Sequence, residues 1–279
     1  MKTPPGGGNS ADQLDLRLWS GAALSLALAC AAAFAWWHVI DETPPRWDES
    51  HYLVGALNEY RAAQVGGPVG LFGAYMTTLT GGANQLPLLA LPGFFLFGPS
   101  AKAGIAIFFL LWPIAIFGMF DLTRHATRSL LGFDEVTSLR AGFLAALLFA
   151  ISPQTQYLSN YFLTEFPLIT CIIVVHAAAL RYMLDGRLRW GPIIGIALAA
   201  GFLAKTTFSA FLIAPAGLIV VRWLRGASPR EIINFITGAA LPPLIIVAPF
   251  YITNFDTIIA TVRFLTSAET ASVFGSAAH

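Results

Sequence analysis

Two adjacent carboxylates, Asp48 and Glu49, lie in the first strongly polar stretch after a long apolar run. Arg46 and His51 flank the pair, and such neighbours tune the pKa of a carboxyl group or bind an anion. Asp48 and Tyr52 are four residues apart, so on a helix they share one face. A carboxylate beside a low-dielectric surface suits a general base for a hydroxyl or amide acceptor. The alternative, a solvated loop in which Asp48 caps a helix, is the common case for such a pair.

A third carboxylate, Glu165, begins a later apolar run, just before Pro167. The helix dipole favours an acid in the first turn, and proline is an ordinary residue there, so a purely structural role explains Glu165 equally well. In the functional alternative, Glu165 faces Asp48 and orients the acceptor or a divalent metal ion.

Lys205 is an isolated lysine in an apolar stretch, followed by Thr206 and Thr207. A charged side chain within a membrane helix is costly and is a candidate for a functional site. The alternative is that Lys205 extends its ammonium to the membrane surface. If it faces the helix bundle instead, the ammonium and the two hydroxyls suit a phosphate group.

Composition predicts an all-α polytopic membrane protein. Of 279 residues, 56% are hydrophobic and 11% are charged, against about 25% charged in soluble domains. The charges separate apolar runs of roughly 18 to 24 residues, which is the length of a membrane-spanning helix. The formal net charge of +1 gives no reason to expect a nucleic-acid partner. The five histidines show no metal-ligand spacing and no phosphate-binding glycine loop is present, so no cofactor is predicted with certainty.

The domain organisation follows from the same pattern. Residues 1–15 are polar and rich in glycine and proline, which predicts a disordered cytoplasmic tail. The membrane domain covers 16–253 and includes a long first loop, 41–100. The first apolar run, 16–40, is longer than the apolar core of a signal peptide, so we expect an uncleaved helix. Residues 254–279 form a weakly patterned tail, which suggests a truncated chain.

Within the first loop, the spacing of apolar residues predicts an amphipathic helix from about 48 to 64, lying on the membrane surface and ended by Gly66-Gly67-Pro68. Residues 86–97 form an apolar patch, interrupted by prolines, that is too short to span and is expected to be re-entrant or interfacial. With the first span, about seven spans are predicted, the others at 102–121, 140–152, 166–184, 191–209, 210–224 and 232–252.

The basic residues predict the orientation. Eleven fall on the side of the N-terminus and five on the other side. Basic residues are enriched in cytoplasmic loops, so the N-terminus is expected in the cytoplasm. The first loop and the short loop 152–166 are then both extracytoplasmic.

Several motifs resemble those of the GT-C glycosyltransferases, above all the protein O-mannosyltransferases, the lipid A aminoarabinose transferases and their bacterial family 39 relatives. The segment 46–52, Arg-Trp-Asp-Glu-Ser-His-Tyr, resembles their first-loop signature. The later matches, in the same order, are 84–88 with their Pro-Pro-Leu stretch, 97–100 with Phe-Gly-x-Ser, 161–168 with their second-loop stretch, and 203–206 with Leu-Thr-Lys-Gly.

The resemblance implies a GT-C fold and an inverting transfer of a hexose or pentose from polyprenyl phosphate. The expected acceptor is a lipid, a glycan or a protein. The reaction would take place on the extracytoplasmic face of a bacterial-type inner membrane. Membrane lipids would be the other partners.

The resemblance also implies roles for individual residues. Asp48 would be the base that activates the acceptor, Glu49 would support it, and Glu165 would complete the acidic pocket. Lys205 would contact the donor phosphate, and Arg46 is a second candidate cation for it. Three further side chains of these motifs are candidates for the pocket wall: His51, Tyr52 and Tyr161.

Two other functions remain open from the sequence. A transporter or flippase should show internal repeats and charged or broken helices near the bilayer midplane. Here the acidic residues lie at loop edges and no repeat is visible. The third alternative is an inactive fragment or a non-catalytic accessory subunit.

Overall fold

A computed structural model describes residues 10–45, 47–77 and 86–265. Four predictions concern residues outside these ranges. They are the disorder of residues 1–9, the anion-binding role of Arg46, the first two residues of the motif at 84–88, and the tail from 266 to 279. All regular structure in the described ranges is helical. The elements are α1 (Ser10–Ile40), α2 (Trp47–Thr77), α3 (Pro87–Phe97), α4 (Ala101–Ile105), α5 (Phe108–Leu130), α6 (Glu135–Ile151), α7 (Pro153–Ser159), α8 (Glu165–Asp185), α9 (Trp190–Ala204), the 3-10 helix η1 (Thr206–Leu212), α10 (Ile213–Leu224), α11 (Pro229–Thr253) and α12 (Phe255–Leu265).

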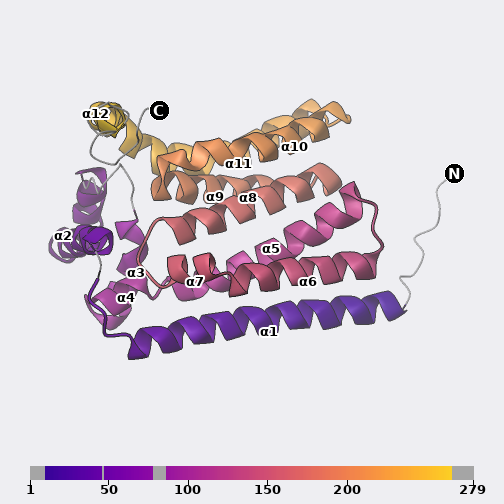
Figure 1. The fold of residues 1–279 in the computed structure, drawn as a ribbon. Helices are drawn as coiled ribbons and strands as arrows, with labels where there is room; N and C mark the ends of the chain where they lie inside the picture. The colour runs from indigo at the N-terminus through magenta and orange to yellow at the C-terminus, as the bar shows by residue number, and fades with distance from the viewer. Residues whose placement is uncertain (1–9, 46, 78–85, 266–279) are drawn as a thin grey trace, which may run out of the picture.

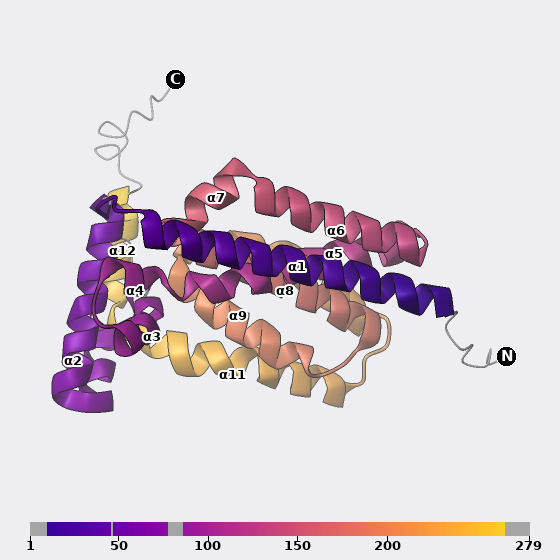
Figure 2. The ribbon, with the colours of Figure 1, turned by 90° about the horizontal axis from the view of Figure 1, so that it is seen from below.

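The long helices lie side by side in one bundle, and the short ones gather with α2 at one end of it (Figures 1 and 2). In the described ranges, five helical segments are long and apolar enough to cross a membrane, or six if α6 and α7, which are bent by 61° relative to each other, form one span. α9 is apolar but has only 15 residues. The all-α polytopic fold is thus confirmed, with a span count close to the expected seven.

Helix α1 shows how one face of a membrane helix is chosen for packing. Ala23, Ala27 and Ala31 are at most 1% exposed and recur every four residues, whereas Leu24 and Leu28 on the other side are about half exposed. Small side chains let helix backbones approach closely in lipid, where apolar surface alone gives no drive to associate. The alanine face of α1 therefore packs on α5 and α6.

Helix α8 lies in the middle of the bundle, in contact with α5, α9 and α10. Its first turn is fixed by Phe166, which is fully buried and packs on the rings of Phe108 and Trp112 with centroids 5.8 Å and 5.1 Å away. Glu165 precedes this anchor directly, so its backbone is held by well-packed aromatic side chains.

The first loop is more helical than predicted. α2 continues past the expected stop and reaches Thr77, with a break at Gly67, where φ is +57° and ψ is −146°. Glycine adopts this conformation without a steric penalty. Pro68 cannot donate a backbone hydrogen bond, but the first position of a helix needs no donor, so it begins the second half of α2.

Several other boundaries differ from the prediction. Residues 10–15, expected in the disordered tail, are the first turns of α1, and 255–265, expected in the C-terminal tail, form α12. The predicted span 191–209 ends at Ala204.

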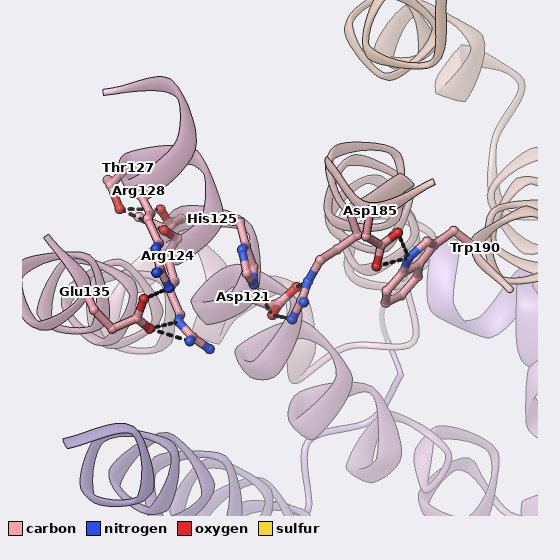
Figure 3. A network of polar contacts seen from close by, with 10 residues as sticks. Asp121, Arg124, His125, Thr127, Arg128, Glu135, Asp185 and Trp190 are labelled. Atoms are coloured by element: carbon pink, nitrogen blue, oxygen red, sulfur yellow. Dashed lines mark hydrogen bonds and ion pairs between the residues drawn. The ribbon is translucent and has the colours of Figure 1, made fainter. Parts of the chain in front are cut away.

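A network of ion pairs lies at the end of the bundle that is opposite to α2 (Figure 3). Arg181 of α8 pairs with Asp121 of α5, and Arg124 and Arg128 of α5 both pair with Glu135 of α6. These pairs explain why α5 extends nine residues beyond the predicted end of its span, since the polar extension is neutralised by α6 and α8. Basic residues that the sequence placed on the N-terminal side do lie at this end.

Candidate functional site

The two adjacent carboxylates at the start of α2 have different surroundings. Asp48 is exposed, whereas Glu49 is only 8% exposed. Both lie in the first turn of the helix, where the helix dipole favours negative charge. The helix begins at Trp47, so Asp48 lies inside the first turn and is not the N-cap. The Ser50 hydroxyl donates to the carbonyl of Pro45 (3.1 Å), which fixes the chain direction at this point.

Glu49 connects the first loop to the second. Its Oε1 accepts a hydrogen bond from the backbone N–H of Phe162 at 2.7 Å. Phe162 is fully buried and its ring lies 5.7 Å from that of Phe108. Glu49 also lines a polar pocket of about 220 Å³ together with Asn160 and Tyr161. The segment that leads into Glu165 is therefore fixed against the start of α2.

Replacing Glu49 by leucine should lower thermal stability, because the buried Phe162 N–H loses its acceptor. An unsatisfied buried donor costs about 1–3 kcal/mol. Glu49→Gln keeps an oxygen in the acceptor position and should cost clearly less. Thermal unfolding of both variants in detergent measures the difference, and equal destabilisation would contradict this role.

Glu165 and Lys205 are 40 residues apart in the sequence and form an ion pair. The Lys205 ammonium lies 2.8 Å from Glu165 Oε1, and both side chains are partly exposed, at 42% and 35%. Lys205 is not inside a helix as predicted, because α9 ends at Ala204 and Lys205 is extended, with φ −162° and ψ 136°. Thr206 and Thr207, both β-branched, weaken continuation of the helix. The extended residue turns the lysine toward α8.

Gly201 makes this break possible. The fully buried ring of Phe208, in η1, lies where a Cβ of Gly201 would stand, with its nearest atom 2.5 Å from that point. Any larger residue at 201 would push η1 away from α9. The position of Lys205 between the two elements therefore depends on this glycine.

An apolar cavity of about 260 Å³ is lined by sequence neighbours of Glu165 and Lys205. Pro167, two residues after Glu165, and Ala204, next to Lys205, both line it. Its other walls come from α3, α5, α9 and α11. The backbone segments that carry the charged pair thus also contribute to an apolar space of the kind that suits a lipid chain.

Asp48, His51 and Tyr52, which were also predicted to belong to the site, are not part of the Glu165–Lys205 ion pair. The Asp48 side chain forms no hydrogen bond or ion pair with Glu165 or Lys205 in the described structure. His51 is exposed and its ring lies 6.2 Å from the ring of Tyr52, which is half-buried. Within the described ranges, no three His, Cys, Asp or Glu side chains are grouped so that they could hold a metal ion.

Glu59 was missed by the sequence analysis. It is fully buried in α2, and neither carboxyl oxygen has a hydrogen-bond partner in the described part of the chain. Burial raises the pKa of Glu59 to about 8. It interacts electrostatically with Tyr75, in the second half of α2. The signal in the sequence was an acidic residue three positions after Ala56, one of the apolar residues whose spacing predicts the amphipathic helix of the first loop.

Comparison with known protein families matches residues 92–252 to the family described as dolichyl-phosphate-mannose-protein mannosyltransferase. The match covers more than half of the chain and includes Glu165 and Lys205, while Asp48 and Glu49 precede it. Comparisons with curated proteins and with solved structures found no match. Given the all-helical membrane fold and the extent of the match, the chain belongs to this family of GT-C membrane glycosyltransferases.

Proposed function

We propose that this protein transfers a sugar from a polyprenyl-phosphate donor to a lipid, glycan or protein acceptor with inversion at the anomeric carbon. The observation that supports this most is the Glu165–Lys205 ion pair, whose sequence neighbours Pro167 and Ala204 line an apolar cavity. The family match supplies the reaction class, and the hydrogen bond from Phe162 to Glu49 brings the first loop to the same end of the bundle.

Lys205 is the proposed ligand of the donor phosphate. An ammonium has three hydrogens, so Lys205 can donate to Glu165 and to a phosphate oxygen at the same time. Glu165 would then fix the ammonium in position, and the cavity lined by Pro167 and Ala204 would hold the first part of the lipid chain.

Asp48 is the proposed general base. Its carboxylate takes the proton of the acceptor hydroxyl while the acceptor oxygen attacks the anomeric carbon. The bond between this carbon and the phosphate oxygen breaks, and its electron pair leaves with the lipid phosphate. Lys205 stabilises the charge that develops on this oxygen. The acceptor gains the sugar with inverted configuration, and polyprenyl phosphate is released.

Replacing Lys205 by methionine should weaken use of the donor by roughly 10- to 100-fold, since a hydrogen bond to a charged group is lost. Lys205→Arg keeps the charge and should retain much of the activity. The measurement is incorporation of labelled sugar from a polyprenyl-phosphate donor into membranes that contain the protein, at several donor concentrations. The proposal requires the loss in the methionine variant to fall on kcat/KM for the donor. Unchanged donor use by Lys205→Met would refute the assignment.

A further inference from the structure

An apolar groove and a polar pocket meet beside the last turn of α1. The groove has a volume of about 420 Å³ and is lined by apolar side chains of α1, α3, α4 and α5, including Phe34 and Leu110. The pocket is the one of about 220 Å³ that contains Glu49. His38 and Lys102 line both spaces, so they stand at the junction.

The junction offers hydrogen-bond donors. The Lys102 ammonium donates to the carbonyl of Val39 at 3.0 Å, which holds the side chain against the end of α1. Its remaining hydrogens can serve a ligand. The Nε2 atom of His38 is buried and has no hydrogen-bond partner in the described part of the chain. A buried polar atom without a partner is costly, and a ligand oxygen at the junction would satisfy it.

Beyond the junction the pocket is acidic. Asp41, Glu42 and Glu49 line it together with the ammonium of Lys102. The hydroxyl (2.6 Å) and backbone N–H (3.0 Å) of Thr43 donate to Asp41 and lower its pKa below the usual value, so this carboxylate is charged at neutral pH. The pocket therefore favours a cationic group over an anionic one.

We propose that the groove and pocket together bind one membrane phospholipid with a primary amino headgroup, of the phosphatidylethanolamine class. The order of surroundings is apolar, then cationic, then acidic, and the lipid presents an acyl chain, a phosphate and an ammonium in this order. The phosphate binds at Lys102 and His38, and the ammonium donates to the carboxylates. A headgroup without an amine would bring no cation to Asp41 and Glu42, and a quaternary ammonium has no hydrogen to donate. Neither Glu165 nor Lys205, where the donor phosphate is proposed to bind, lines the groove or the pocket.

Binding of three lipids to the purified full chain in detergent tests the proposal. Phosphatidylethanolamine, phosphatidylglycerol and phosphatidylcholine with identical acyl chains are compared by native mass spectrometry. Phosphatidylethanolamine should bind about tenfold more tightly than the other two, because a charge-assisted hydrogen bond distinguishes it. Lys102→Gln should reduce this binding by about the same factor.

A matched pair of α1 variants locates the acyl chain. Ala35 lines the groove, whereas Ala33 is exposed on the same helix and does not line it. Ala35→Trp should abolish the preferred binding and Ala33→Trp should leave it unchanged. Equal binding of the three lipids, or equal binding by the two tryptophan variants, would overturn the proposal. If Ala35→Trp fails to fold, the order of the three lipids on the unmodified protein decides by itself.

Discussion

Asp48→Asn should lower sugar transfer by about 10²- to 10⁴-fold, which is the usual contribution of general base catalysis. The amide has nearly the shape of the carboxylate but cannot accept the proton of the acceptor hydroxyl. Asp48 is exposed, and substitutions of exposed residues without special contacts change stability by less than about 0.5 kcal/mol. The loss should therefore appear in kcat with unchanged thermal stability. Transfer of labelled sugar from a polyprenyl-phosphate donor in membranes provides the measurement.

Asp256→Asn is the matched control for this experiment. Asp256 is also an exposed aspartate in the first turn of a helix, α12, at the same end of the bundle (Figure 1). It should retain full activity, which separates the role of Asp48 from a general effect of surface charge. Near-normal transfer by Asp48→Asn would remove Asp48 from the mechanism. The role of Lys205 would then still be open to its own test, because the two residues act on different substrates.

The parts of the fold that depend on apolar length were predictable from the sequence. The span expected at 166–184 is α8, at Glu165–Asp185, because a run of this length in a membrane has few alternatives to a helix. The gathering of Glu49, Phe162, Glu165 and Lys205 at one end followed from counting spans and alternating sides.

Features that depend on single contacts were not predictable in this way. The end of α9 before Lys205 is set by Phe208 packing against Gly201 and by the ion pair with Glu165. Neither contact is visible in a hydropathy pattern, which continued the span to 209. The continuation of α2 beyond Gly67 likewise depends on one backbone conformation, and a Gly-Gly-Pro sequence more often ends a helix than bends it.

Glu59 should make the stability of the protein fall as pH rises from about 4.5 to about 8. Burial raises the pKa of Glu59 from 4.5 to about 8 in the folded state. Between these values the folded state binds one proton more than the unfolded state, so raising the pH favours unfolding. Below 4.5 both states are protonated, and the contribution to stability is fully present. Above 8 it is lost, at a total cost on the order of a few kcal/mol.

Glu59→Gln should remove this pH dependence, because the amide is neutral at every pH and has the shape of the protonated acid. The variant should match the unmodified protein at pH 4.5 and exceed its thermal stability at pH 8.5, as measured by thermal unfolding in detergent. Other acids, such as Glu165 paired with Lys205, titrate in both proteins, so the difference between the two curves isolates Glu59. Glu42→Gln, at an exposed glutamate, should leave the curve almost unchanged. Parallel curves for Glu59→Gln and the unmodified protein would show that Glu59 is already ionised, and that the docking of α2 does not depend on a neutral carboxyl.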